Sequence, residues 1–359
     1  SRVVPVRLGE APLPLCPWEL RWVRLRLVRM FAAPLQSLSK TPVMLTQRYV
    51  IGSIVASVLA LAFALNSPQP KAPAPRFAEA ERLGRIENKG LDELSGLEAS
   101  FYDDDLFWAH GDDKSTLYAI DSTGDHVAKV DIRDTSNVDW EDMTSFEVNE
   151  TSYLLIADTG ANRPKKADYH LICIEEPQRN SATSTFAKSV EPEWTLQFRF
   201  PDKKGRVDCE AVAADGENGL ILLLTKEENK DDASTLYSVP LPNTSVKKAT
   251  ASRLATIDSI VLATANDSPR KSKPTSLDIR NDGRIAIVLT HRHAYAFVRK
   301  PDVTWREAFL ARPILVELPE MEQPEAICFD HSSQALIVTS ERGGGKRHAP
   351  VFRIPISMK

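Results

Sequence analysis

A phrase repeated five times between residues 92 and 356 constrains the fold more than any other feature of this chain. Each copy has a short lead-in with acidic or hydroxyl side chains, then an apolar segment ending in a polar pair, then a segment with an aromatic residue. The lead-ins are residues 93–97, 139–143, 208–212, 275–279 and 323–327. Repetition at such intervals is typical of solenoids and propellers, so it indicates the architecture of the whole region.

The segments within each copy have the length and pattern of β-strands. The second segment is a continuous apolar run, as in Tyr153–Ala157, which is typical of a strand buried on both faces. The third segment tends to alternate, and turn residues such as Asn281-Asp282-Gly283 separate the strands. Because no helical periodicity of useful length follows residue 90, the sequence predicts an all-β chain.

The copies predict a single β-propeller with five four-stranded blades. Fourth strands are expected at 126–132, 194–200, 252–257 and 314–318. The last copy ends after three strands, so Arg82–Ile86 is expected to supply its outer strand and close the ring. A sixth blade would have to lie within 178–205 or 255–272, and neither segment contains a full copy.

The N-terminal residues 1–76 are expected to lie outside the propeller, which we predict over residues 77–359. Residues 44–65 contain the uncharged run Tyr49–Leu65 after Arg48, which fits a signal peptide slightly better than a signal anchor. The basic segment 1–43 fits either an upstream translation artefact or a cytoplasmic tail. Residues 66–76 read as a stiff Pro-rich linker. Both interpretations of the N-terminus predict an extracytoplasmic domain, with membrane contact only through an uncleaved N-terminal segment.

The distribution of charge argues against a nucleic-acid partner. The net charge is −4, and residues 1–48 hold eight basic and two acidic side chains, so the remainder carries −4 − 6 = −10. No basic stripe is left in the main domain to pair with phosphates. The four cysteines lack CxxC spacing, which favours buried thiols over a zinc site. A single bridge between Cys209 and Cys328 is the alternative.

Ring closure would bring the lead-in side chains to one mouth of a central channel. They are Ser95, Glu141, Asp142, Glu210, Asp278 and Glu325, and in the fourth copy Ser276 competes with Asp278 for the inward position. Carboxylates that face one another suit Ca²⁺ or Mg²⁺ rather than zinc. The candidate metal ligands, for Ca²⁺ above all, are Glu141, Asp142, Glu210, Asp278 and Glu325. The favoured alternative is structural: each acid accepts hydrogen bonds from backbone N–H groups of the next blade.

The polar pairs after the second strands form another set on the same face, where loops usually carry function. This set contains His110, Asp112, Asp158, Asn162, Arg163, Lys226, His291, Arg292, Glu341 and Arg342. Solvated salt bridges among these residues are the favoured interpretation. Otherwise a ligand is expected at Asp112, Asp158, Asn162, Arg163, Lys226 and Glu341. His110 and His291 are the candidate general bases, and no GxSxG or HExxH motif is present.

Several phrases resemble a family of uncharacterised secreted bacterial β-propeller proteins over about residues 90–356. The resemblance rests on Glu93–Leu97, Asn137–Met143, Ala157–Arg163, Glu210-Ala211 with Thr225-Lys226, and Glu325–Ile327. It implies an extracytoplasmic propeller and brings no established reaction. Gly111 stands where that family tends to carry Asn, and Ala161 replaces an Asp, which removes oxygen donors. The acidic mouth is also loosely similar to lactonase-like and phytase-like propellers, an analogy of fold only.

Two functions are compatible with these residues. The first is a non-catalytic binding scaffold that presents its rim loops to a protein, glycan or small-molecule ligand. The second is a Ca²⁺-dependent hydrolase of esters, lactones or phosphoesters, in which His110 or His291 moves a proton. The missing oxygens at positions 111 and 161 favour the first.

Overall fold

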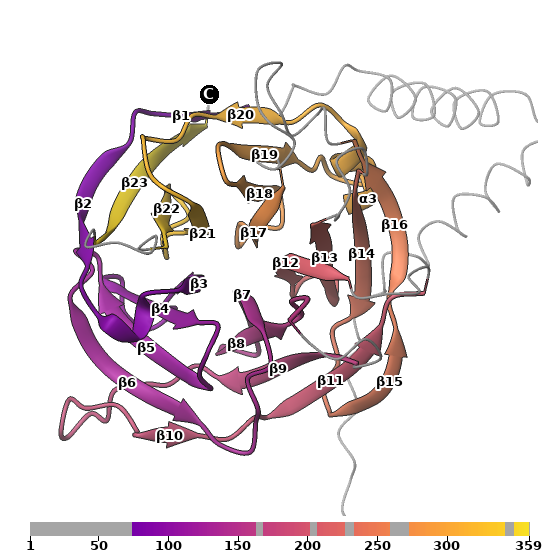
Figure 1. Ribbon diagram of the computed structural model, residues 1–359. Helices are drawn as coiled ribbons and strands as arrows, with labels where there is room; N and C mark the ends of the chain where they lie inside the picture. Colours follow the sequence, from indigo (N-terminus) through magenta and orange to yellow (C-terminus); the bar gives the residue numbers. More distant parts are fainter. Residues whose placement is uncertain are drawn as a thin grey trace, which may run out of the picture. The chain divides into compact units, whose positions relative to one another are not determined.

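Five β-sheets surround a central channel in the computed structural model (Figure 1). The structure describes residues 74–162, 168–201, 207–226, 233–258, 273–341 and 348–358. The predictions for the basic segment, the signal region, most of the linker, Cys16, Arg163 and Arg342 lie outside these residues. Among the described residues, no helix has the length and apolar character needed to cross a bilayer.

The five sheets are the five blades predicted by the repeat, and the fold is a β-propeller. Blade 1 contains β3 (Leu94–Ala99), β4 (Leu106–Gly111), β5 (Thr116–Asp121) and β6 (His126–Ile132). Blade 2 contains β7 (Trp140–Val148), β8 (Thr151–Asp158), β9 (Tyr169–Glu175) and β11 (Trp194–Arg199). Blade 3 contains β12 (Asp208–Asp215), β13 (Leu220–Lys226), β14 (Ser234–Pro240) and β16 (Ser252–Ile257).

The last two blades complete the ring. Blade 4 contains β17 (Pro274–Ile279), β18 (Ile285–Thr290), β19 (Ala294–Val298) and β20 (Ile314–Val316). Blade 5 contains β21 (Pro324–Phe329), β22 (Ala335–Ser340) and β23 (Ala349–Met358), and its fourth strand is β2 (Glu81–Ile86). The short β1 (Pro75–Phe77) pairs with the other end of β23. The predicted closure by the N-terminal strand is therefore confirmed.

Extra strands lengthen two blades at their outer edges. β10 (Ser189–Val190) pairs in parallel with β6 of blade 1, and β15 (Val246–Thr250) pairs in parallel with β11 of blade 2. The described part of 178–205 therefore does not form a sixth blade. Its strand β10 extends blade 1, and its strand β11 is the fourth strand of blade 2. These additions cover strand edges that would otherwise be open to pairing.

The hydrophobic core is divided among the five gaps between neighbouring blades. On β8, Leu154 and Ile156 face blade 1, while Leu155 and Ala157 face blade 3. The strand is buried on both faces, because it has a blade on each side. This is the physical reason for the continuous apolar runs in the repeat.

The structure also adds a short helix, α3 (Trp305–Leu310), between β19 and β20. Thr304 and Glu307 form a capping box at its start, and Phe309 stacks on Phe297 with ring centroids 4.4 Å apart. Six residues are too few to show a helical period in the sequence. A 3₁₀ turn, η1 (Lys89–Leu91), precedes β3.

The cysteines of the propeller are free. Cys173, Cys209 and Cys328 are buried thiols without a disulfide bond. The favoured prediction of buried thiols is confirmed, and the alternative bridge between Cys209 and Cys328 is wrong.

Candidate functional site

The innermost strands β3, β7, β12, β17 and β21 surround the channel, each in contact with the next (Figure 1). All five have a β-bulge at the same level near their N-terminal ends. A bulge adds an unpaired residue and re-aims its side chain. The residues at this level are Ser95, Glu141, Cys209 with Glu210, Thr275 and Glu325. Three of the candidate metal ligands are therefore bulge residues.

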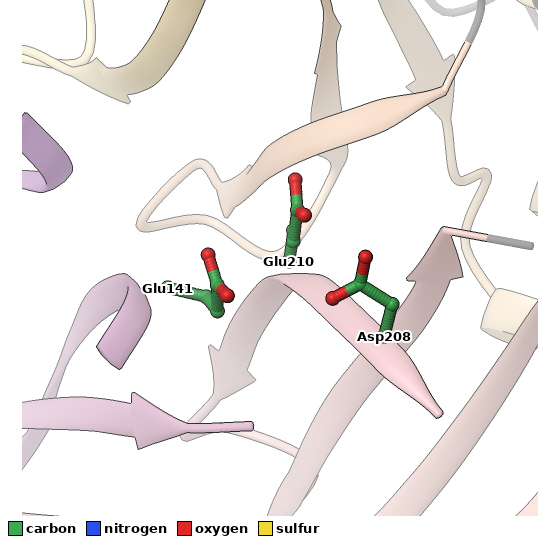
Figure 2. Close-up of side chains that lie close together, drawn as sticks. All are labelled: Glu141, Asp208 and Glu210. Atoms are coloured by element: carbon green, nitrogen blue, oxygen red, sulfur yellow. The ribbon is translucent and has the colours of Figure 1, made fainter. Parts of the chain in front are cut away.

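Glu141, Asp208 and Glu210 form a compact group of carboxylates at the N-terminal ends of β7 and β12 (Figure 2). We call this end of the channel the acidic mouth. One oxygen of each residue lies within 4.8 Å of one oxygen of each of the others. Glu141 and Asp208 are partly buried, and the Glu210 side chain is 12% exposed. The sequence prediction did not include Asp208 among the metal ligands, although Asp208 is the first residue of the third lead-in, as Asp139 is of the second.

Two basic side chains, Lys226 and His291, lie at this mouth. The Lys226 ammonium at the end of β13 donates to Glu210. On the next blades, His291 Nδ1 lies 3.4 Å from Glu325 Oε1, and the side chains of this pair are 15% and 12% exposed. The attraction of Lys226 reaches Glu325 as well. Glu325 therefore belongs to the acidic mouth, as a neighbour of the three-carboxylate group.

The carboxyl groups of the acidic mouth hold their protons more tightly than exposed carboxyls. Burial, and then repulsion from Glu210 and Asp139, raises the pKa of Glu141 well above its usual value. Burial and repulsion from Asp208 raise the pKa of Glu210 to about 8, against the attraction of Lys226. Burial also raises the pKa of Glu325. A divalent cation would relieve this repulsion, because it would neutralise the carboxylates without protons.

The loop after β8 closes over this group. A side chain at Gly160 would overlap the carboxylates of Glu141 and Asp139, so only glycine permits this approach. Thr159 Oγ1 donates to Cys209 O at 2.6 Å, which ties the loop to the lead-in of blade 3. The acidic residues of blades 2 and 3 are thus placed by contacts between blades.

The predicted rim residues serve several different purposes. Asp158 accepts from Asp139 N at 3.0 Å, and Asn162 donates from N and Nδ2 to Asp139 at 2.6 and 3.0 Å. These two residues organise the loop around Asp139. Glu341 accepts from Gln323 Nε2 at 2.9 Å. Burial, and then repulsion from Glu93, raises the pKa of Asp112 to about 6.

Asp142 and Asp278 are not part of the acidic mouth, contrary to the sequence expectation of one shared mouth. Asp142 lies deeper in the channel and accepts from Val212 N at 2.8 Å, Leu277 N at 3.0 Å and Met143 N at 3.0 Å. Ser276 Oγ also donates to it at 3.0 Å. A single side chain thus connects blades 2, 3 and 4. This is the structural role that the sequence interpretation favoured.

Asp278 lies one level further along the channel, towards its other end. Its carboxylate accepts from Phe329 N at 2.8 Å and Ile279 N at 2.7 Å, which connects blades 4 and 5. Ser276 and Asp278 both face the channel, at successive levels. By contrast, no backbone N–H of the described residues donates to Glu141, Asp208 or Glu210, so these three carboxylates retain their capacity to bind a cation.

The two candidate general bases occupy different environments. His110 is fully buried, with its ring against Trp140 at 5.3 Å between centroids and its Nε2 facing Gly96. Burial lowers its pKa to about 4. A neutral, enclosed imidazole of this kind serves packing, because substrate cannot reach it. His291, at the acidic mouth beside Glu325, is the better placed of the two.

The pH dependence of stability is a direct consequence of these buried acids. The usual pKa values of Glu210 and Asp278 are 4.5 and 3.8, and the folded protein raises them to about 8 and about 7. Folding therefore keeps protons that the unfolded chain has lost, and stability falls as pH rises towards 8. The pKa of His110 is lowered from 6.5 to about 4, so His110 reduces stability only as the pH falls below 6.5. Above pH 6.5 it no longer changes the stability.

We therefore expect the urea midpoint of the metal-free protein to fall between about pH 6.5 and 8.5. Glu210→Gln should make this dependence shallower, because glutamine does not titrate. Exposed Glu193→Gln serves as the matched control and should leave the slope unchanged. A midpoint that rises over this interval would contradict the assignment.

Comparisons with known proteins give only distant likenesses. No protein-family model and no curated protein matches the sequence. Among solved structures, the chain is similar to a PQQ-bound aldose sugar dehydrogenase from Streptomyces coelicolor, with 10% identity, a TM-score of 0.42, and coverage of 80% of this chain and 100% of that one. It is also similar to regucalcin, a calcium-binding protein from Agrobacterium tumefaciens, with 11% identity, a TM-score of 0.42, and coverage of 77% and 96%.

A luciferin-regenerating enzyme gives a likeness of the same size, with 10% identity, a TM-score of 0.44, and coverage of 79% of this chain and 95% of that one. Likenesses at this level carry no argument about this chain. The resemblance of the sequence to uncharacterised secreted propellers stays a prediction. Function has to be argued from the site.

Proposed function

We propose that this chain is an extracytoplasmic, non-catalytic binding propeller whose acidic mouth holds Ca²⁺ through Glu141, Asp208 and Glu210. The observation that carries the proposal is the convergence of three carboxylates within 4.8 Å, with no backbone donor among the described residues. Ca²⁺ takes six to eight oxygen ligands, and carboxylates are its usual protein ligands. The all-oxygen donor set suits Ca²⁺ and not zinc, which prefers nitrogen and sulfur.

The open positions on the ion define how a ligand would bind. Three carboxylates fill at most six coordination positions, and fewer where each binds through one oxygen. Hydroxyl or carboxylate oxygens of a glycan or a small molecule could complete the shell at the rim. Asp112 and Glu341 are rim residues available to contact such a ligand. The acidity of this face argues against a nucleic-acid partner.

Lys226 competes with the metal for Glu210. The ammonium of Lys226 donates to Glu210 from a side chain that is 17% exposed. In the Ca²⁺-bound protein this lysine would turn away from the carboxylate. Lys226→Met should therefore raise the affinity for Ca²⁺. If the Lys226–Glu210 pair has only a structural role, the Lys226→Met variant should instead be less stable, and Ca²⁺ should not restore its stability.

Thermal unfolding with and without Ca²⁺ tests the proposal. We expect millimolar Ca²⁺ to raise the Tm of the EDTA-treated protein, because an ion that binds only the folded state stabilises it. Asp208→Asn and Glu210→Gln should each abolish most of this shift, and Glu193→Gln should preserve it. The shift should increase between pH 6.5 and 8.5, because the ligands must lose their protons. An unchanged Tm with Ca²⁺ at pH 8.5 would refute the proposal.

A second function is favoured by one observation. His291 lies 3.4 Å from Glu325 at the same mouth, and a histidine next to a carboxylate can move a proton. We propose as the alternative a Ca²⁺-dependent hydrolase of esters, lactones or phosphoesters, with His291 as general base. Ca²⁺-dependent turnover of a chromogenic ester that is lost in His291→Gln, with Ca²⁺ binding retained, would decide for the enzyme.

A further inference from the structure

A cavity lies at the end of the channel opposite the acidic mouth, and we call it the far mouth. Its volume is about 310 Å³, near the lower end of the range for small-molecule sites. The C-terminal ends of all five innermost strands line it. Glu141, Asp208 and Glu210 do not line it, so the two ends of the channel are chemically separate.

Glu98 on β3 presents a buried carboxylate oxygen to this cavity. The residue is 4% exposed, and its Oε1 accepts a hydrogen bond from Ser145 Oγ at 3.0 Å. Its Oε2 is buried and has no hydrogen-bond partner among the described residues. A buried acceptor without a donor costs free energy, so this atom indicates a missing donor.

Acidic side chains outnumber basic ones around this cavity. Asp278 also lines it and is held by backbone N–H groups from two blades. The two basic side chains of the lining, Arg280 and His331, are paired with Asp282 and with Asp104 at 3.4 Å, both outside the lining. A cation from solution would therefore be favoured here.

The remaining lining distinguishes an organic cation from a metal ion. Phe101, Phe146 and Phe329 contribute apolar surface to the same cavity. Aromatic faces attract ammonium groups and pack against alkyl chains. Three buried carboxylates line the cavity, and one of them, Asp215, is already held by Asn218, Trp305 Nε1 and Arg299. Glu98 and Asp278 are left to meet a ligand, and the described residues provide a compact three-carboxylate cluster only at the acidic mouth.

We propose that the far mouth binds a small primary alkylammonium ion. Its ammonium group donates to Glu98 Oε2 and to Asp278, and its alkyl chain packs against the phenylalanine side chains. This site is independent of the Ca²⁺ site of the proposed function.

The ligand would replace a proton that the empty site holds. Burial, and then repulsion from Asp278, raises the pKa of Glu98 well above its usual value, and burial raises the pKa of Asp278 to about 7. An ammonium group favours the ionised carboxylates, so binding should release protons near pH 7. The other titratable groups on the strands around Glu98 are His110 on β4, Glu141, Asp142 and Glu147 on β7, and Glu325 and Cys328 on β21, with Asp330 and His331 directly after β21.

Calorimetric titration of the full chain with n-butylammonium chloride tests the inference, with n-butanol as the neutral analogue of the same shape. We expect saturable binding of the amine, with a Kd at least about tenfold lower than that of the alcohol. The alcohol loses at least one charge-assisted hydrogen bond, and the free energy of one such bond corresponds to about a tenfold change in Kd. Glu98→Gln should weaken amine binding at least about tenfold, and Glu193→Gln should leave it unchanged. The binding enthalpy should differ between phosphate and MOPS buffers by the difference in their ionisation enthalpies, multiplied by the number of protons released.

Three outcomes would overturn the inference. They are no saturable amine binding, equal affinity for amine and alcohol, and an amine affinity that is unchanged in Glu98→Gln. Circular dichroism and the urea midpoint establish whether Glu98→Gln is folded, and Asp278→Asn provides the second variant if it is not. A Ca²⁺ titration that loses binding in Glu98→Gln and keeps it in Glu210→Gln would assign the far mouth to the metal instead.

Discussion

Replacing Asp142 with alanine is expected to remove about 3–5 kcal/mol from the free energy of unfolding, a large part of the roughly 5–15 kcal/mol of a folded protein. The carboxylate accepts from backbone N–H groups on β7, β12 and β17 and from Ser276 Oγ. Alanine would leave these donors buried without an acceptor, and each such group costs about 1–3 kcal/mol. Urea unfolding followed by circular dichroism measures the loss.

Two variants frame this result. Asp142→Asn keeps the shape of the side chain, but its amide NH₂ group would face two of the donors that the carboxylate accepts from. This variant should therefore be less stable than the natural protein and more stable than Asp142→Ala. Ser276→Ala removes one of the four donors and should cost about 1 kcal/mol. If Asp142→Ala loses less than about 1 kcal/mol, the carboxylate does not connect the blades.

Deleting residues 75–86 is expected to abolish cooperative folding of the propeller. These residues form β1 and β2, and without them β23 has an exposed edge and blade 5 has no outer strand. Ile86, which is fully buried between blades 5 and 1, is lost as well. An open edge next to exposed core residues favours aggregation. Size-exclusion chromatography and thermal melting should show aggregates or no cooperative transition.

A point variant tests the same closure without shortening the chain. A side chain at Gly84 would overlap the backbone oxygen of Thr123, in the turn of blade 1 that also accepts from Arg85 N at 2.8 Å. Gly84→Ala should therefore destabilise the protein, by about 1–3 kcal/mol. Gly219→Ala is the matched control, since a side chain there meets nothing within 4 Å and costs only its positive φ of 62°. Equal stabilities of the two variants, or a deletion variant that melts like the intact protein, would exclude closure by the N-terminal strand.

Much of the fold could be predicted because the apolar and turn residues of each repeat mark its strands. The apolar run at Tyr153–Ala157 predicted a strand buried on both faces, and β8 is packed between two blades. The missing fourth strand of the last copy predicted a partner at Arg82–Ile86, and β2 fills that place. The helix α3 could not be predicted, because its six residues carry a cap and no full period.

The candidate site was predicted less completely. Glu141, Glu210 and Glu325 reach one mouth, whereas Asp142 and Asp278 lie at deeper levels and accept backbone hydrogen bonds. Asp208 joins the group although the sequence prediction omitted it. Strand alternation would put neighbours such as Glu141 and Asp142 on opposite faces, and the bulge between Trp140 and Asp142 breaks that rule.

The sequence by itself determined the number of blades, the strand order and the closure of the ring, because each follows from repeating pattern and from the need to cover a strand edge. Only the tertiary structure decided which acids meet and at which end of the channel. That choice depends on a one-residue bulge in every inner strand and on how neighbouring blades pack, and neither leaves a periodic signal in the sequence. The channel therefore has two chemically different ends, where the repeat alone indicated one.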